Sequence, residues 1–80
     1  MSAVVDLPIC LQAVYRQGHI YVSYADGSEV KFPVSVNRRL NGQTEEKLSH
    51  IEIGHFGIHW PELDEDLSHV GLRAGRFGQG

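Results

Sequence analysis

The chain has 80 residues and a formal net charge of -3, and hydrophobic residues make up 41% of it. This length predicts one domain with a small core, because so short a chain buries only about 60% of its unfolded surface. The acidic balance argues against general nucleic-acid binding, which needs a basic patch, and no apolar run approaches the ~20 residues that cross a bilayer.

We predict a loose N-terminal arm over residues 1–8 and a single domain over residues 9–73. Residues 74–80 contain three glycines and are predicted to form a flexible tail. The N-terminus lacks the basic start and the cleavage pattern of a signal peptide. Cys10 is the only cysteine, so no internal disulfide can form, as is typical of the reducing cytosol. We therefore expect a cytoplasmic protein that does not enter a membrane.

Alternating apolar residues predict three strands over residues 9–16, 19–25 and 29–32. Gln17-Gly18 predicts a tight turn between the first two strands. Asp26-Gly27 predicts a type I′ hairpin between the second and the third, because that turn needs positive φ at both central positions. The side chains expected to face the core are Ile9, Leu11, Ala13, Tyr15, Ile20, Val22, Tyr24, Val30 and Phe32.

Two short helices are predicted in the middle of the chain. Val36 and Leu40 stand one helical turn apart, ahead of an Asn-Gly pair that is a natural stop. Thr44 is expected to cap a second helix that runs through Leu48, with acidic residues in its first turn.

The C-terminal half predicts two further strands and a final helix. Residues 50–53 and 56–60 alternate as strands do, with these side chains inward: Ile51, Ile53, Phe56, Ile58 and Trp60. Pro61 ends the second of these strands because it has no N–H for the ladder. Asp66 is expected to cap a short helix whose apolar residues are Leu63, Leu67, Val70 and Leu72. The whole pattern predicts an α+β domain, with an antiparallel sheet of about five strands and two or three short helices.

The histidines His55 and His59 are four residues apart, which on a helix would bring both rings to one metal ion. On the predicted strand the same spacing separates their Cα atoms by about 13 Å, so we expect both side chains to face solvent. No second cysteine and no third converging ligand supports a zinc site. We predict neither a metal site nor a cofactor.

Four acidic residues follow the last predicted strand: Glu62, Asp64, Glu65 and Asp66. A calcium loop would need glycine at the sixth position from Asp64 and glutamate at the twelfth, where this chain has His69 and Gly75. The run is therefore interpreted as N-capping and macrodipole stabilisation of the final helix. A binding surface for a basic partner is the alternative.

No catalytic residues are predicted. Paired carboxylates serve acid–base catalysis where burial separates their pKa values, and the sequence predicts no such pocket. Cys10 lies on a predicted strand, where a free cysteine is usually a small buried hydrophobe rather than a nucleophile. The glycines do not follow a phosphate-binding spacing.

The ending IHWPELDEDLSHVGLRAG, together with the strand–DG–strand hairpin, resembles a small bacterial family, the domain of unknown function DUF2442. That family ends in I-x-W-P-x-[LA]-D-x-D-[IL]-S-x-x-[GL]-L, and its hairpin motif matches Tyr24, Asp26 and Gly27. The resemblance covers roughly residues 11–75. The residues that match the ending are Ile58, Trp60, Pro61, Leu63, Asp64, Asp66, Leu67, Ser68, Gly71 and Leu72.

The resemblance implies a compact α+β domain without an established activity or catalytic residues. Some members stand beside a second small protein gene in toxin–antitoxin-like pairs, and some carry a helix-turn-helix domain after this one. Because this chain ends at Gly80, we expect no such DNA-binding domain here. The matched residues are interpreted as structural: Trp60 in the core, Pro61 as strand stop, Asp64 and Asp66 as caps, and Leu67 and Leu72 docking the helix.

We therefore expect a non-catalytic protein-binding module, an antitoxin-like or inhibitor partner of another small protein, which also pairs with itself through an exposed sheet edge. Tyr21 faces away from the core, where an interface anchor and a cross-strand role are equally plausible. The alternative is a nucleic-acid-linked regulator that acts with a DNA-binding partner, with Arg38 and Arg39 on phosphate. The candidate partner-binding residues are Tyr21, Arg38, Arg39, Glu62 and Glu65.

Overall fold

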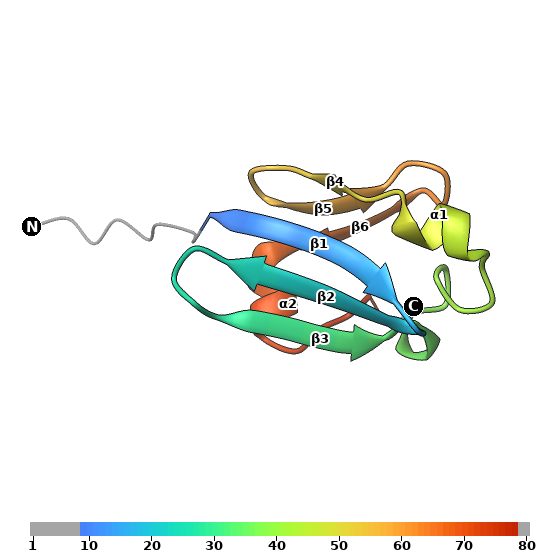
Figure 1. The fold of residues 1–80 in the computed structure, drawn as a ribbon, viewed down its shortest axis with the longest axis horizontal. Coiled ribbons are helices and arrows are strands. Elements are labelled where there is room, and N and C mark those ends of the chain that lie inside the picture. The colour runs from blue at the N-terminus through green and yellow to red at the C-terminus, as the bar shows by residue number, and fades with distance from the viewer. Residues whose placement is uncertain (1–8, 79–80) are drawn as a thin grey trace, which may run out of the picture.

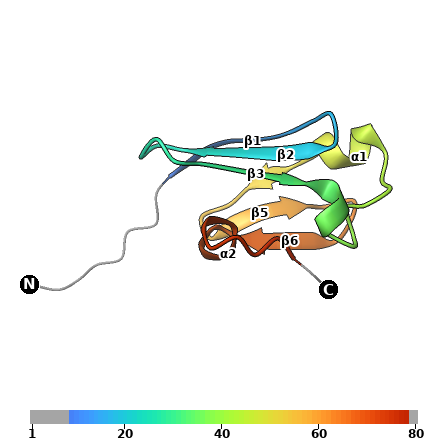
Figure 2. The same cartoon turned by 90° about the horizontal axis from the view of Figure 1, so that it is seen from below.

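The computed structural model describes residues 9–78, so the predicted arm of residues 1–8 lies outside the described residues. Two antiparallel sheets of three strands each pack face to face (Figure 1, Figure 2). The first sheet contains β1 (Cys10–Arg16), β2 (His19–Tyr24) and β3 (Glu29–Pro33), and the second β4 (Glu52–Ile53), β5 (Gly57–Trp60) and β6 (Glu65–Ser68). The helices are η1 (Val34–Val36), α1 (Glu45–Ser49) and α2 (His69–Arg73). The predicted α+β fold is confirmed, with its strands divided between two sheets.

The core lies between the two sheets and follows from the alternation of their strands. Every second residue of β2 is buried, and β5 buries Ile58 and Trp60 in the same way. Trp60 is fully buried, and its indole N–H donates to the carbonyl of Leu48 at 3.1 Å, which fastens α1 to β5. The buried apolar residues are Ile20, Val22, Tyr24, Phe32, Leu40, Leu48, Ile58, Trp60, Leu67 and Leu72.

The two hairpins of the first sheet differ in their turns. Gln17 and Gly18 both have positive φ, at 48° and 84°, as a type I′ turn requires. In the second hairpin only Gly27 does, at 90°, and its N–H donates to the carbonyl of Tyr24 at 3.0 Å. The predicted type I′ turn at Asp26-Gly27 is therefore wrong, because the loop is one residue longer and glycine takes its left-handed position.

A β-bulge in β1 changes the expected exposure of its first residues. Cys10 pairs with Tyr24 and Gln12 pairs with the residue before it, so Leu11 is an extra residue without a partner on β2. Leu11 is 64% exposed and Ile9 70% exposed, so the prediction that they face the core is wrong. The inward positions beyond the bulge are correctly predicted, and these residues pack against the core: Ala13 and Tyr15.

The predicted helix between Val36 and Leu40 is wrong, because η1 ends at Val36 and turns follow over residues 38–42. Asn37 explains the difference: its Oδ1 accepts from the backbone N–H of Arg39 and of Leu40 at 2.9 and 3.0 Å, which holds a turn in place of a helix. The prediction for α1 is confirmed, since the Thr44 hydroxyl caps it by accepting a backbone N–H at 3.3 Å.

The acidic run lies in a hairpin and not at the start of a helix. After Trp60 the chain turns back, where the N–H of Leu63 donates to the Trp60 carbonyl at 3.1 Å and Asp64 has a positive φ of 52°. Asp66 then lies within β6, so the prediction that it caps the last helix is wrong. The cap is Ser68, whose hydroxyl accepts a backbone N–H of α2 at 2.9 Å.

Three further apolar residues expected in the core lie at the surface. Ile53 is 45% exposed, Phe56 72% and Val70 54%. β4 is only two residues long and β5 begins at Gly57, so the alternation of β5 does not extend to Phe56. Leu72 is buried in α2, as predicted.

Phe77, which belongs to the predicted flexible tail, packs against the first sheet. The Phe77 ring stacks on that of Phe32, with centroids 4.5 Å apart and planes 9° from parallel. The Asn37 side chain donates to the carbonyl of Phe77 at 2.8 Å. Within residues 9–78, no helix has the length and apolar character that crossing a membrane requires.

Candidate functional site

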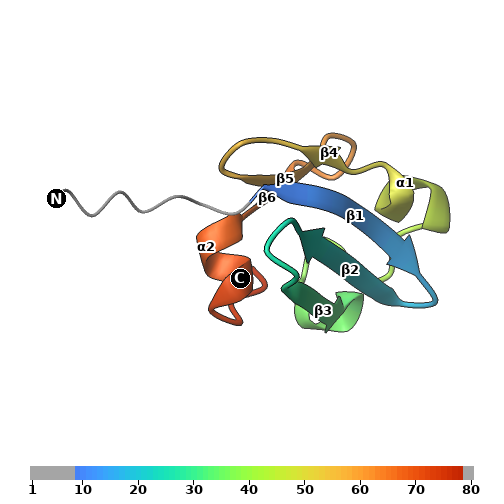
Figure 3. The ribbon, with the colours of Figure 1, turned by 60° about the vertical axis from the view of Figure 1, so that its left-hand side comes forward.

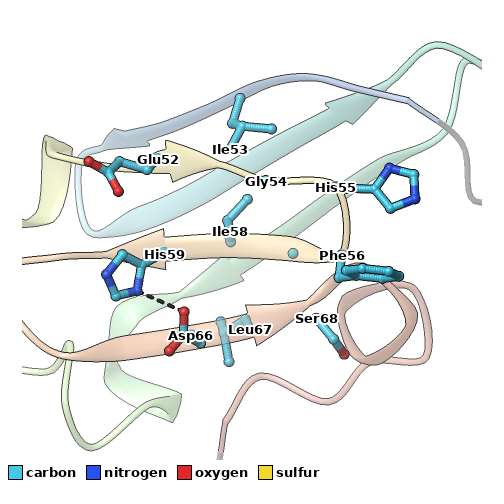
Figure 4. A pocket seen from close by; sticks show the side chains of 11 residues that line it. Glu52, Ile53, Gly54, His55, Phe56, Ile58, His59, Asp66, Leu67 and Ser68 are labelled. Atoms are coloured by element: carbon cyan, nitrogen blue, oxygen red, sulfur yellow. Dashed lines mark hydrogen bonds and ion pairs between the residues drawn. The ribbon is translucent and has the colours of Figure 1, made fainter.

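The outer face of the second sheet carries a hollow of about 480 Å³ (Figure 4). Pairing across the sheet places Glu52 of β4, His59 of β5 and Asp66 of β6 side by side. We call these three residues the acidic row. The next cross-strand pair is Gly57 and Ser68, and because Gly57 has no side chain, the hollow opens beside the row.

The close approach of β5 and β6 requires a glycine at position 57. A Cβ atom at this position would lie 2.2 Å from the carbonyl oxygen of Leu67 and 2.9 Å from the Cα atom of Ser68. No real Cβ makes such contacts, so a larger residue requires the two strands to separate. The floor of the hollow, where Gly57 has no side chain, is therefore a consequence of strand packing.

Phe56 forms one end of the hollow, opposite the acidic row (Figure 4). It lies with His55 at the tip of the turn between β4 and β5, which is closed by a hydrogen bond from the Gly54 N–H to the Gly57 carbonyl at 2.8 Å. The two rings form an edge-to-face pair, with centroids 4.7 Å apart. Phe56 is 72% exposed, so its ring is available for contact with a partner.

The acidic row carries net negative charge. His59 Nδ1 lies 2.7 Å from Asp66 Oδ1, and Glu52 is its cross-strand neighbour on the other side. Two carboxylates flank one imidazole, so the row is negative whether the ring is neutral or protonated. A second such pair joins His50 to Glu62, again at 2.7 Å.

The chemistry that the row offers is hydrogen bonding and charge. A His–Asp pair is one part of a nucleophilic triad, but within residues 9–78 no serine, threonine or cysteine side chain is hydrogen-bonded to His59. Ser68 Oγ instead accepts from a backbone N–H as a helix cap. In the same part of the chain, no three His, Cys, Asp or Glu side chains come together in a way that could hold a metal ion.

A buried histidine that the sequence did not indicate holds the turn behind the hollow. His69 Nε2 lies 3.0 Å from the Gly54 carbonyl, and Nδ1 lies 3.0 Å from the Tyr24 hydroxyl. Because a carbonyl only accepts, Nε2 carries a proton, and in the neutral ring the Tyr24 hydroxyl donates to Nδ1. Burial raises the pKa of Tyr24 above its usual value. One feature of the sequence could have indicated this contact: Tyr24 is predicted to face inward, and a buried tyrosine hydroxyl needs a hydrogen-bond partner.

The predicted partner-binding residues do not form one surface. Tyr21 lies on the outer face of the first sheet, whereas Glu62 lies in the turn between β5 and β6 of the second. Arg38 and Arg39 lie in the turns after η1.

Glu65 is largely internal, since only 13% of its side chain is exposed. Its Oε2 accepts from Asn37 Nδ2 at 2.7 Å, and Arg39 Nε lies 3.8 Å from its Oε1. Asn37 is fully buried and also bonds two backbone N–H groups and the Phe77 carbonyl. Glu65 therefore belongs to a network that joins β6 to the turn after η1 and to the end of the chain.

Asp26 connects the loop between β2 and β3 to α2, which lies beside it (Figure 3). Its carboxylate accepts from the N–H and hydroxyl of Ser28 at 2.9 and 2.6 Å and from Arg73 Nη2 at 3.1 Å. The bonds from Ser28, assisted by Arg73, hold the pKa of Asp26 below its ordinary value of 3.8. The Asp-Gly hairpin motif thus supports the packing of a helix as well as a turn.

Comparison with known proteins finds relatives without an assigned function. A crystal structure of a protein of unknown function from Rhodospirillum rubrum is 34% identical, with a TM-score of 0.79 over 91% of this chain and 93% of that one. A solution NMR structure of an uncharacterised protein from Chromobacterium violaceum is 33% identical, with a TM-score of 0.73 over 90% of this chain and 68% of that one. No curated protein matches the chain.

The family comparison covers nearly the whole described domain. Residues 11–78 match the family described as "Protein of unknown function (DUF2442)". The match includes both the Asp-Gly hairpin and the ending that carries Trp60 and Asp66, so it confirms the resemblance seen in the sequence. The chain belongs to the DUF2442 family.

Proposed function

We propose that this protein is a non-catalytic protein-binding module, which acts as an antitoxin-like or inhibitor partner of another small protein. The observation that carries the proposal is the hollow on the second sheet, with Phe56 exposed at one end and the acidic row at the other. An exposed aromatic residue beside a polar rim is typical of protein interfaces, in which a few aromatic anchors supply most of the binding energy.

A partner would place an apolar side chain against Phe56 and a basic side chain over the acidic row. Burial of apolar area contributes roughly 25 cal/mol per Å², so a phenyl ring offers on the order of 3 kcal/mol before the cost of association. The negative row favours a basic partner and speeds its approach. Covering the partner's working surface would inhibit it without any chemical step.

The test is untagged co-purification from the native host, at native abundance, with the wild-type chain and with Phe56→Ala. We expect the wild type to bring down one stoichiometric small protein and Phe56→Ala to lose most of it. Val36→Ala is the matched control, because Val36 is also an exposed apolar residue but does not line the hollow. Recovery of the wild-type chain alone, or equal loss in both variants, would contradict the proposal.

A further inference from the structure

We infer that the outer face of the first sheet carries a second binding site, centred on Tyr21, for an acidic segment of a protein partner. Cross-strand pairing places Val14, Tyr21 and Lys31 in one outward row. Arg16 and His19 form the next outward pair toward the Gln17-Gly18 turn. The strands therefore gather three basic side chains around one tyrosine ring.

The geometry around Tyr21 is that of two cations sharing one aromatic ring. The Arg16 guanidinium carbon lies 5.2 Å from the ring centroid, and Lys31 Nζ lies 5.4 Å from it. Each cation–π contact contributes roughly 0.5–1 kcal/mol at an exposed site. The ring thus holds two flexible basic side chains over one part of the sheet.

Within residues 9–78, neither cation has a carboxylate oxygen within 4.0 Å. Arg39 and Arg73, in contrast, are paired with Glu65 and Asp26. Two unpaired like charges beside one ring repel each other, and a bound anion relieves that repulsion. The site is therefore electrostatically suited to a negative ligand before any partner arrives.

A hollow of about 260 Å³ gives the ligand room beside the ring. Its lining includes Arg16, Tyr21 and Lys31, together with the polar side chains of Gln12 and Ser23. Alternate residues of an extended peptide project from one side about 7 Å apart. A segment of the form acidic-x-acidic can therefore reach both cations while its backbone lies over the polar side chains.

A short acidic peptide fits this surface better than a nucleic acid does. Only two full positive charges are available here, Glu29 lies on the same hollow, and the whole chain has a net charge of -3. Nucleic-acid affinity depends on contacts to several phosphates and on a broad positive surface. With Arg16 and Lys31 against Glu29, the hollow carries a small positive excess, which suits a short acidic segment.

The site lies on the first sheet and the hollow of the proposed function on the second, so either can fail without the other. The test is a ¹⁵N NMR titration of the full chain, at low salt, with the capped peptide Glu-Ser-Glu-Ser-Glu. We expect chemical-shift changes centred on Arg16, Tyr21 and Lys31. The dissociation constant should be at least fivefold larger in both Arg16→Glu and Lys31→Glu, and it should increase further as the salt concentration rises.

Lys47→Glu is the matched control, because it makes the same change of charge at an exposed position of α1 that does not line this hollow. It should bind the peptide within twofold of the wild type. Equal weakening in this control would overturn the inference, as would shift changes located elsewhere. Equal or tighter binding of a thymidine hexanucleotide, or identical shifts with inorganic phosphate alone, would also overturn it, because the site would then not select a peptide.

Discussion

Gly54 and Gly57 flank the same turn and look alike in the sequence, but the structure gives them different roles. A Cβ at Gly57 would lie 2.2 Å from a backbone oxygen, whereas one at Gly54 has its nearest neighbour at an ordinary 3.4 Å. Gly57→Ala should therefore cost about 1–3 kcal/mol of unfolding free energy, in the range of other overpacked sites. Gly54→Ala should change it by less than about 0.5 kcal/mol.

Urea denaturation followed by the fluorescence of Trp60, the single tryptophan and a fully buried one, measures both variants. The comparison is informative because the two substitutions add the same methyl group to the same turn. Equal effects of the two variants would show that β5 and β6 can separate freely, and the bare floor of the hollow would then need another explanation.

At the scale of elements, the contact between the β2–β3 loop and α2 depends on an ionised carboxylate. The pKa of Asp26 is lowered by hydrogen bonds from Ser28 and by Arg73. A depressed pKa in the folded state stabilises the protein above the unfolded value of about 3.9, and this stabilisation is lost as pH falls through the folded value. Asp26→Asn cannot titrate, so the stability difference between wild type and variant should be constant above about pH 5 and shrink below pH 4.

The measurement is urea denaturation of both chains between pH 2.5 and 7, with the difference in unfolding free energy plotted against pH. Other carboxylates titrate in both chains, so their contribution cancels in the difference. A difference that does not vary with pH would contradict the role assigned to the charged form of Asp26.

The elements that the sequence predicts well are those in which one local rule dominates. Strict alternation in β2 and the β-branched and aromatic residues of β5 predict the buried faces correctly, and the Thr44 cap predicts where α1 begins. Alternation does not predict the exposure of Leu11, because a bulge adds one residue to β1 and shifts which side chains face outward. The capping rule fails at Asp66, because the sequence alone does not distinguish a helix-capping aspartate from one at the start of a strand until its pairing partner is known.

The candidate sites are harder to predict, because they depend on register between strands. The sequence gives Tyr21 as a surface residue, but Arg16 and Lys31 reach its ring only through the pairing of β1, β2 and β3. Phe56 is expected in the core, since its place in an alternating run conceals that β5 begins one residue later. Residues distant in the chain define both surfaces.

At the scale of the whole molecule, the two sheets are held together by more than apolar packing. The Tyr24 hydroxyl and the His69 ring meet at 3.0 Å, and their rings form an edge-to-face pair with centroids 5.4 Å apart. His69 also bonds the Gly54 carbonyl in the turn after β4. One buried imidazole thus links the first sheet, α2 and the second sheet, and each of these depends on the others for its position.

This coupling predicts that Tyr24 and His69 are not energetically independent. In a double-mutant cycle with Tyr24→Phe and His69→Leu, we expect an interaction free energy of about 1–2 kcal/mol, because each single substitution leaves the other polar group buried without its partner. The control cycle pairs Tyr21→Phe, on the outer face of the first sheet, with His69→Leu, and it should be additive within about 0.5 kcal/mol. Urea denaturation measures both cycles. An additive result for the first cycle would mean that the Tyr24–His69 contact does not couple the two sheets energetically.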